Sequence, residues 1–114
     1  MAPWFADHRI DAILMPATVV PATPIGHDAH GDIGDNAVPL GTAMARNISP
    51  GSTLGLPSLV LPCGLTTGGL LVAVELDGPA GNDRRPLAIG MAEEVLLGVL
   101  PAPDCQSLRR SATA

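Results

Sequence analysis

The sequence lacks lysine altogether, because all six of its basic residues are arginine. A lysine that acts as a general base or forms a Schiff base is therefore excluded within this polypeptide. The arginines occur singly or in isolated pairs such as Arg84-Arg85 and Arg109-Arg110, and the formal net charge is -5. Because neutralising nucleic-acid phosphates requires clustered Lys or Arg side chains, nucleic-acid binding is not expected.

Aromatic residues are almost as scarce, since the chain contains Trp4 and Phe5 but no tyrosine. A core must therefore be built from Leu, Val, Ile, Met and Ala, which leaves few large side chains to fill space. The two cysteines, Cys63 and Cys105, form neither a CxxC motif nor a disulfide framework. This sparse use of cysteine favours a reducing compartment.

Long apolar runs are also lacking, because proline interrupts the hydrophobic segments. A membrane-spanning helix needs about 20 consecutive apolar residues, so no membrane span is expected. Asp7 and Asp11 stand where a secretory signal would carry positive charge. We therefore expect a soluble, cytoplasmic protein.

Glycine and proline are abundant instead, with 13 and 12 residues among 114, a length that fits one domain. Two apolar runs, residues 58–61 and 70–76, are bounded by glycine and proline and predict buried strands. A glycine-rich connection, residues 62–69, joins them. The second run lacks clean alternation, which predicts burial on both faces, as in the interior of an α/β sheet.

A helix is predicted over residues 84–97, with Asn82 or Asp83 as its N-cap and Gly98 as its stop. Its apolar residues recur at i, i+4 spacing, so we expect this stripe to face the sheet, while Glu93 and Glu94 face solvent. The stripe consists of Leu87, Ala88, Met91, Ala92 and Val95. Weaker signals predict the rest of the chain. A helix end is expected within residues 1–10 and a short buried strand over 11–16. An extended loop over 17–25, turns over 26–36 and a turn of helix within 43–46 follow.

Several motifs of the chain follow one another in an order that resembles a known family. They are Asn47, Gly55-Leu56-Pro57-Ser58, Pro62-Cys63-Gly64, Gly69-Leu70, Asp77-Gly78-Pro79, Asp83, Leu87 and Glu94. In this order they resemble the C-terminal part of the amidase signature family, and residues 11–18 look like a strand that lies upstream in that family. Residues 76–97 are especially like its mandelamide and indoleacetamide hydrolase branch. The resemblance covers residues 3–103.

The chain departs from the family at two points. Where the family usually has Gly-Leu-Pro-x-Gly, this chain has Gly69-Leu70-Leu71-Val72-Ala73, so we expect a straighter strand there. Family members hydrolyse amides with a serine nucleophile, a second serine and a lysine base, all in the N-terminal half of a longer chain. This chain has neither lysine nor adjacent serines, so the resemblance places no catalytic residue in it.

The resemblance implies an α/β fold with a partial mixed β-sheet, one main C-terminal covering helix and long Gly/Pro-rich loops. Residues 1–103 would form the C-terminal part of an amidase-type domain, and residues 104–114 a disordered tail. No catalytic, cofactor-binding or metal-binding residue is expected.

Two other groups of residues could carry chemistry. His27, Asp28, His30, Asp32 and Asp35 lie within nine residues, but metal binding would need two or three of them to converge. Because no helix holds their spacing, a structural Gly/Asp loop is the favoured interpretation and a metal site the alternative.

The second group contains Cys63 and the serines. Cys63 follows a predicted strand, and as a nucleophile it would need a base from the three histidines, His8, His27 and His30. A small buried apolar residue is the favoured interpretation. Ser49, Ser52 and Ser58 lack a Gly-x-Ser-x-Gly context and are interpreted as turn and cap residues.

Three hypotheses of function follow. The first is the C-terminal segment of an amidase that converts carboxamides to acid and ammonia, inactive alone because the catalytic residues are absent. The second is a non-catalytic partner that completes a separate N-terminal amidase half, or that associates with itself through exposed strand edges. The third is a metal-binding module that uses His27 and His30.

Overall fold

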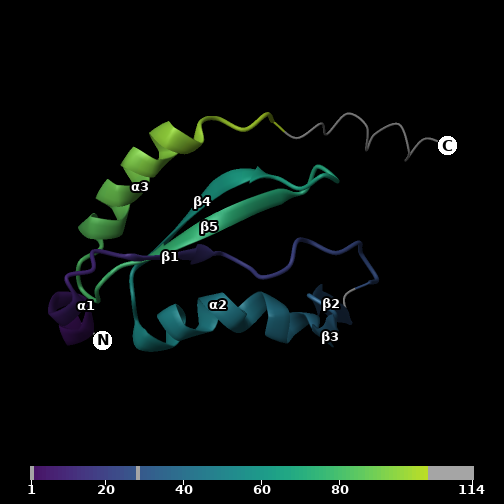
Figure 1. Ribbon diagram of the computed structural model, residues 1–114, viewed down its shortest axis with the longest axis horizontal. Helices are drawn as coiled ribbons and strands as arrows, with labels where there is room; N and C mark the ends of the chain where they lie inside the picture. The colour runs from purple at the N-terminus through teal and green to yellow at the C-terminus, as the bar shows by residue number, and fades with distance from the viewer. Residues whose placement is uncertain (1, 28, 103–114) are drawn as a thin grey trace.

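The computed structural model describes residues 2–27 and 29–102, so the tail predicted over residues 104–114 lies outside the described residues. The elements follow one another along the chain as Figure 1 shows. They are α1 (Ala2–His8), β1 (Ile13–Pro16), β2 (His30–Ile33), β3 (Asn36–Pro39), α2 (Leu40–Leu54), β4 (Ser58–Leu65), β5 (Leu71–Asp77) and α3 (Arg84–Leu97).

Strand β5 is the centre of a three-stranded sheet with the order β1-β5-β4, and both of its pairings are antiparallel. Ile13 and Ser58 both pair with Asp77, so one row of residues crosses all three strands. Helix α3 lies over one face of the sheet and α2 lies on the opposite side (Figure 1). The predicted α/β class is confirmed, although the strands of the described ranges include no parallel pair.

Strand β4 extends to Leu65, so residues 62–65 are strand and not part of the predicted connection. The register shifts between Pro62 and Gly64, which leaves Cys63 in a β-bulge. Proline is tolerated at this position because β4 pairs with β5 on one side only, as an edge strand of the described sheet. The remaining turn is closed by the Thr66 N–H, which donates to the Leu70 carbonyl at 2.8 Å.

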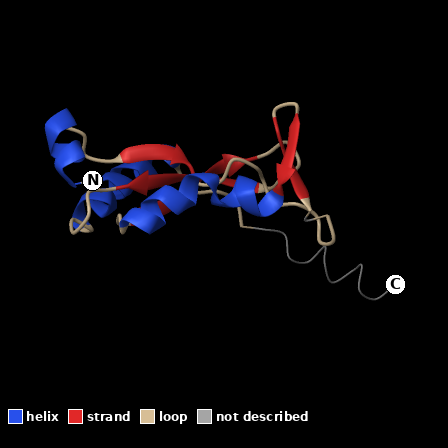
Figure 2. Ribbon diagram, turned by 90° about the horizontal axis from the view of Figure 1, so that it is seen from below, coloured by secondary structure: helices blue, strands red, loops and turns tan. Residues whose placement is uncertain are grey.

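Residues 26–36, predicted as turns, contribute to a second sheet. Strands β2 and β3 pair antiparallel, with His30 opposite Pro39, and Gly34 adopts a positive φ of +61° in the turn between them. The hairpin is held at Gly31, where an added Cβ would lie 3.2 Å from Val20 and 3.3 Å from Leu40. Figure 2 shows the hairpin standing away from the three-stranded sheet.

Helix α2 is much longer than the turn of helix predicted within residues 43–46. Pro50 lies inside it, where a proline removes one helical hydrogen bond, yet the helix continues to Leu54. It ends at Gly55, whose φ of +64° is in the left-handed region, and the next N–H, of Leu56, donates to the Gly51 carbonyl at 3.0 Å.

Helix α3 has the predicted bounds, and Gly98 ends it with a φ of +74°. Asp83 stands at the N-cap, but its side chain makes no capping hydrogen bond. The orientation is the reverse of the predicted one, since Leu87, Met91 and Val95 are 52%, 71% and 83% exposed. The residues that α3 buries are Pro86 and Gly90.

Helix α3 meets the sheet at Gly90, which has no side chain, and this explains why the large apolar residues face outward. A Cβ on Gly90 would lie 2.2 Å from Leu59 Cδ2 and 3.5 Å from Leu61 Cδ1, so the helix backbone sits directly on the side chains of β4. A large residue could not occupy that position without moving β4. The apolar stripe therefore lies on the far side of the helix.

The buried apolar residues are few and dispersed. They are Phe5, Ala17, Val20, Ala43, Leu56 and Leu76. Strand β5 is buried at residues 75–77, whereas Leu71 is 58% exposed, so the burial predicted on both faces holds only at the end of the strand. The radius of gyration is 17.0 Å, against about 13 Å for a compact domain of this length. Within the described ranges, no helix is long and apolar enough to span a membrane.

Candidate functional site

Two buried carboxylates at the end of β5 form the most distinctive polar cluster of the described residues. Glu75 and Asp77 are each only 2% exposed. Because residues two apart on a strand share a face, both side chains lie on the side of the sheet away from α3. Ser58 stands opposite Asp77 on β4, and its Oγ donates a hydrogen bond to Asp77 Oδ1.

Helix α2 closes this cluster from the other side. A Cβ on Gly51 would lie 2.6 Å from Asp77 Oδ2 and 3.1 Å from Asp77 Cγ, so only glycine lets the helix approach the carboxylate this closely. One turn earlier, the Asn47 side-chain amide donates to the Pro16 carbonyl at 2.7 Å, which ties α2 to the end of β1. The cluster therefore joins α2, β4 and β5.

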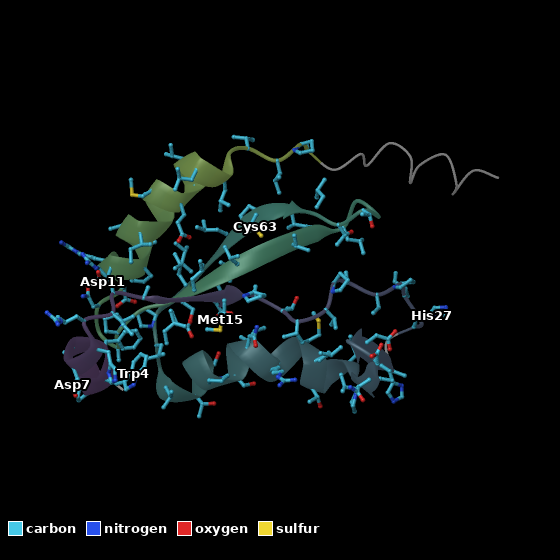
Figure 3. The ribbon with its side chains drawn as sticks, viewed as in Figure 1. Trp4, Asp7, Asp11, Met15, His27 and Cys63 are labelled. Carbon is cyan, nitrogen blue, oxygen red and sulfur yellow. The ribbon has the colours of Figure 1, made fainter. Side chains whose placement is uncertain are left out.

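Glu75 lacks a partner for one of its oxygens. Its Oε2 is buried and has no hydrogen-bond partner among the described residues. Burial, followed by the negative charge of Asp77, raises the pKa of the Glu75 carboxyl, while Ser58 opposes this shift. Its cross-strand neighbours Met15 and Val60 are not titratable. Figure 3 shows Met15 on the α2 side of the sheet.

The chemistry open to this cluster is proton binding and not nucleophilic attack. The Ser58 hydroxyl is bonded to a carboxylate, whereas an activated serine needs a histidine or lysine base within hydrogen-bond reach. Arg46, the charged residue of α2, is exposed. We therefore interpret Glu75 and Asp77 as an acid pair that fixes three elements and favours the neutral form of Glu75.

Cys63, the predicted alternative nucleophile, is part-buried in the β-bulge. Its Sγ donates to the Val72 carbonyl at 3.6 Å. In Figure 3, His27 lies at the right-hand edge of the described chain, away from Cys63 in the middle. Cys63 also lines an apolar groove of about 350 Å³ beside the loop of residues 17–22 and the start of β5. Nothing in this arrangement activates the thiol.

The residues of the possible metal site are not brought together. His27 and Asp35 are exposed, His30 and Asp32 lie on β2, and Asp28 falls outside the described residues. Within residues 2–27 and 29–102, no group of three or more His, Cys, Asp or Glu side chains is placed to hold a metal ion.

The serines were interpreted wrongly as turn and cap residues. Ser49 and Ser52 lie inside α2, and Ser58 is the first residue of β4. Sequence reasoning also missed Glu75 and Asp77 as a cluster. The signal was present, because two acidic residues alternate in the otherwise apolar run of β5. Their shared partner Ser58 follows only from the strand register.

Comparison with known proteins shows which enzymes the chain is similar to. No family model matches the chain. The indoleacetamide hydrolase of Agrobacterium vitis is 42% identical over 101 residues, which make up 89% of this chain and 22% of that protein. The mandelamide hydrolase of Pseudomonas putida is 34% identical over 106 residues, 87% of this chain and 18% of that protein.

A solved structure agrees with these relatives. A crystal structure of an amidase matches with a TM-score of 0.73 and 31% identity, over 78% of this chain and 20% of that one. Over most of its length the chain is similar to amidases, and the predicted resemblance is confirmed. Its relatives include hydrolases of indoleacetamide and mandelamide. The chain spans about a fifth of the length of the relatives that it matches.

Proposed function

We propose that residues 1–103 are the C-terminal segment of an amidase, and residues 104–114 its tail. The complete enzyme would add water to a carboxamide and release a carboxylic acid and ammonia. The observation that carries this proposal is the 42% identity to an indoleacetamide hydrolase across 89% of the chain. The agreement in fold with a fifth of an amidase supports it.

In this proposal the segment is scaffold for a catalytic centre built elsewhere. The absence of lysine and of adjacent serines supports this role. The hydrogen bond from Ser58 to Asp77 supports this role too, because it uses the hydroxyl group to hold β4 against β5. The chain alone is therefore expected to be inactive.

A chimera tests the proposal directly. The 101 matched residues of the Agrobacterium vitis indoleacetamide hydrolase would be replaced by the corresponding residues of this chain, and ammonia release from indoleacetamide would be measured. We expect turnover by the chimera and none by the 114-residue chain or by the hydrolase with the segment deleted. A folded but inactive chimera, or an active isolated chain, would contradict the proposal.

A second candidate is a separate chain that completes an N-terminal amidase half in trans. The unpaired outer edge of β4 in the described sheet favours it, because such an edge is a template for pairing with another strand. Co-expression of this chain with the segment-deleted hydrolase distinguishes the two candidates. Recovery of ammonia release from the mixture supports assembly in trans, whereas activity only in the covalent chimera rejects it.

A further inference from the structure

The outer face of α3 carries a continuous group of apolar side chains. It is formed by Leu87, Ala88, Met91, Ala92 and Val95, all of which are exposed, and we call it the α3 ridge. Met91 and Val95 expose 71% and 83% of their surface. The ridge lies on the other side of α3 from the buried residues Pro86 and Gly90.

Apolar residues thus lie on both the inner and the outer side of α3. The inner side meets Leu59 and Leu61 of β4 through Gly90, and the charged residues of the helix are Arg84 and Arg85 in the first turn and Glu93 and Glu94 near the end. Contrary to the prediction that it faces solvent, Glu93 is half-buried, and its Oε2 has no hydrogen-bond partner among the described residues. A helix on the surface of a globular protein carries polar residues opposite its packed face. On α3 that opposite side carries the apolar ridge instead, which is typical of a helix that is covered there too.

We propose that the α3 ridge is an internal interface with the remaining four-fifths of the amidase chain, an inference that rests on the proposed function. The solved amidase matches this chain over 20% of its own length, so most of its fold comes from elsewhere in the sequence. The extended shape of the chain, with its 17.0 Å radius of gyration, agrees with a piece that other layers enclose.

A second copy of this chain is a poorer occupant. Exposed apolar side chains also occur on other elements, with Leu14 of β1 at 57%, Val60 of β4 at 54% and Leu71 of β5 at 58%. A two-fold dimer uses one self-complementary patch on each copy. Such a contact would cover the ridge and leave the other surfaces open, whereas a remainder four times as long as this segment is large enough to cover all of them.

The partner surface that meets the ridge must itself be apolar, because none of the five ridge side chains carries a charged or strongly hydrogen-bonding group. Exposed Glu94, between Ala92 and Val95 in the sequence, is the nearest charged residue at that end of the helix. Ala88 and Ala92 leave low points between the larger residues, into which the side chains of a facing helix or sheet can fit. A charge placed on the ridge would be buried without a partner in the complete enzyme but hydrated in the isolated chain.

That difference defines the experiment. The double substitution Met91→Glu/Val95→Glu is made both in the 114-residue chain and in the chimeric hydrolase. We expect the Tm of the chimera to fall by about 5 °C or more, or soluble chimera to be lost, while the urea midpoint of the isolated chain stays unchanged. Thr67→Glu in the exposed β4–β5 turn is the matched control and is expected to leave both proteins unaffected.

The outcomes separate the alternatives. A doubly substituted chimera as stable as the unmodified one overturns the proposal. So does a dimer of the isolated chain, found by sedimentation, that the double substitution dissociates while the chimera is unaffected. An unmodified chimera that folds without hydrolysing indoleacetamide refutes the proposed function, yet its Tm with and without the substitutions still decides on the ridge.

Discussion

Helices α2 and α3 approach opposite faces of one sheet, and each does so through a glycine. Gly51 of α2 lies against the carboxylate of Asp77, and Gly90 of α3 lies against the branched end of Leu59. In both helices large apolar residues face outward, as Ile48 and Met91 do. The two contacts differ in how easily the side chain that faces the glycine can move. Asp77 is short, buried and hydrogen-bonded to Ser58, whereas Leu59 can change rotamer.

The largest effect is expected from Gly51→Ala, which tests the rigid contact. The new Cβ would lie 2.6 Å from Asp77 Oδ2, and overpacking of this kind costs about 1–3 kcal/mol. We expect a net loss of about 2 kcal/mol in the free energy of unfolding, measured by urea titration with far-UV circular dichroism. Gly41→Ala in the same helix, where a Cβ meets nothing within 4 Å, is expected to be neutral or stabilising. Equal stabilities of Gly51→Ala and Gly41→Ala would show that the contact with Asp77 is not rigid.

Glu75→Gln tests the acid pair through the pH dependence of the free energy of unfolding. Because the folded-state pKa of Glu75 is raised above its ordinary value of 4.5, folding favours the protonated form. That stabilisation is fully present below pH 4.5 and is lost as pH rises through the folded-state pKa. The glutamine variant should therefore match the parent chain in acid and exceed its urea midpoint at pH 8. Glu94→Gln, at an exposed position of α3, is the control. A constant difference between variant and parent at all pH values would argue against the acid pair.

Gly90→Ala tests the contact with the movable side chain of Leu59 and should have a smaller effect than Gly51→Ala. Its Cβ would lie 2.2 Å from Leu59 Cδ2, but this is the far end of a flexible side chain. Replacing a helical glycine by alanine also gains about 1 kcal/mol. We expect a net change within about 1 kcal/mol of the parent free energy of unfolding, by the same titration. In a double-mutant cycle, Leu59→Ala should make Gly90→Ala stabilising, and additive effects of the two substitutions would show that they do not meet.

The smallest effect is expected at the ion pair that links α3 to the segment before β1. Arg85 Nη2 lies 2.5 Å from Asp11 Oδ1, and the two side chains are 47% and 63% exposed. Exposed pairs of this kind contribute about 0–1 kcal/mol and are screened by salt. Arg85→Gln should lower the urea midpoint slightly at low ionic strength and not at all in 1 M salt. A large, salt-independent loss would mean that Arg85 acts through packing of its stem.

The elements that the sequence predicts well are those with clear boundaries. Helix α3 begins and ends where residues 84–97 were predicted, because Gly98 allows the positive φ that ends the helix. Strand β5 is close to its predicted range for the same reason, since glycine flanks its apolar run on both sides. Helix α2 was predicted only as a turn within residues 43–46, whereas it runs from Leu40 through Pro50 to Leu54.

The orientation of α3 and the position of the acid pair could be determined only from the tertiary structure. Periodicity shows that α3 has an apolar stripe, but only the close contact of Gly90 with Leu59 decides which side meets the sheet. Glu75 and Asp77 are visible as alternating charges in an apolar strand. That they share a buried site with Ser58 depends on the pairing of β4 with β5, which no local pattern encodes.

The scarcity of aromatic residues has a practical consequence at α1. Trp4, the single tryptophan of the chain, packs edge-on against buried Phe5 at 5.5 Å between ring centroids and stacks near His8 at 4.8 Å. Without tyrosine, the intrinsic fluorescence of the chain comes from this one indole ring. Its emission wavelength is sensitive to the release of Phe5 from the core. The chain therefore carries a built-in optical probe of whether its first helix is docked.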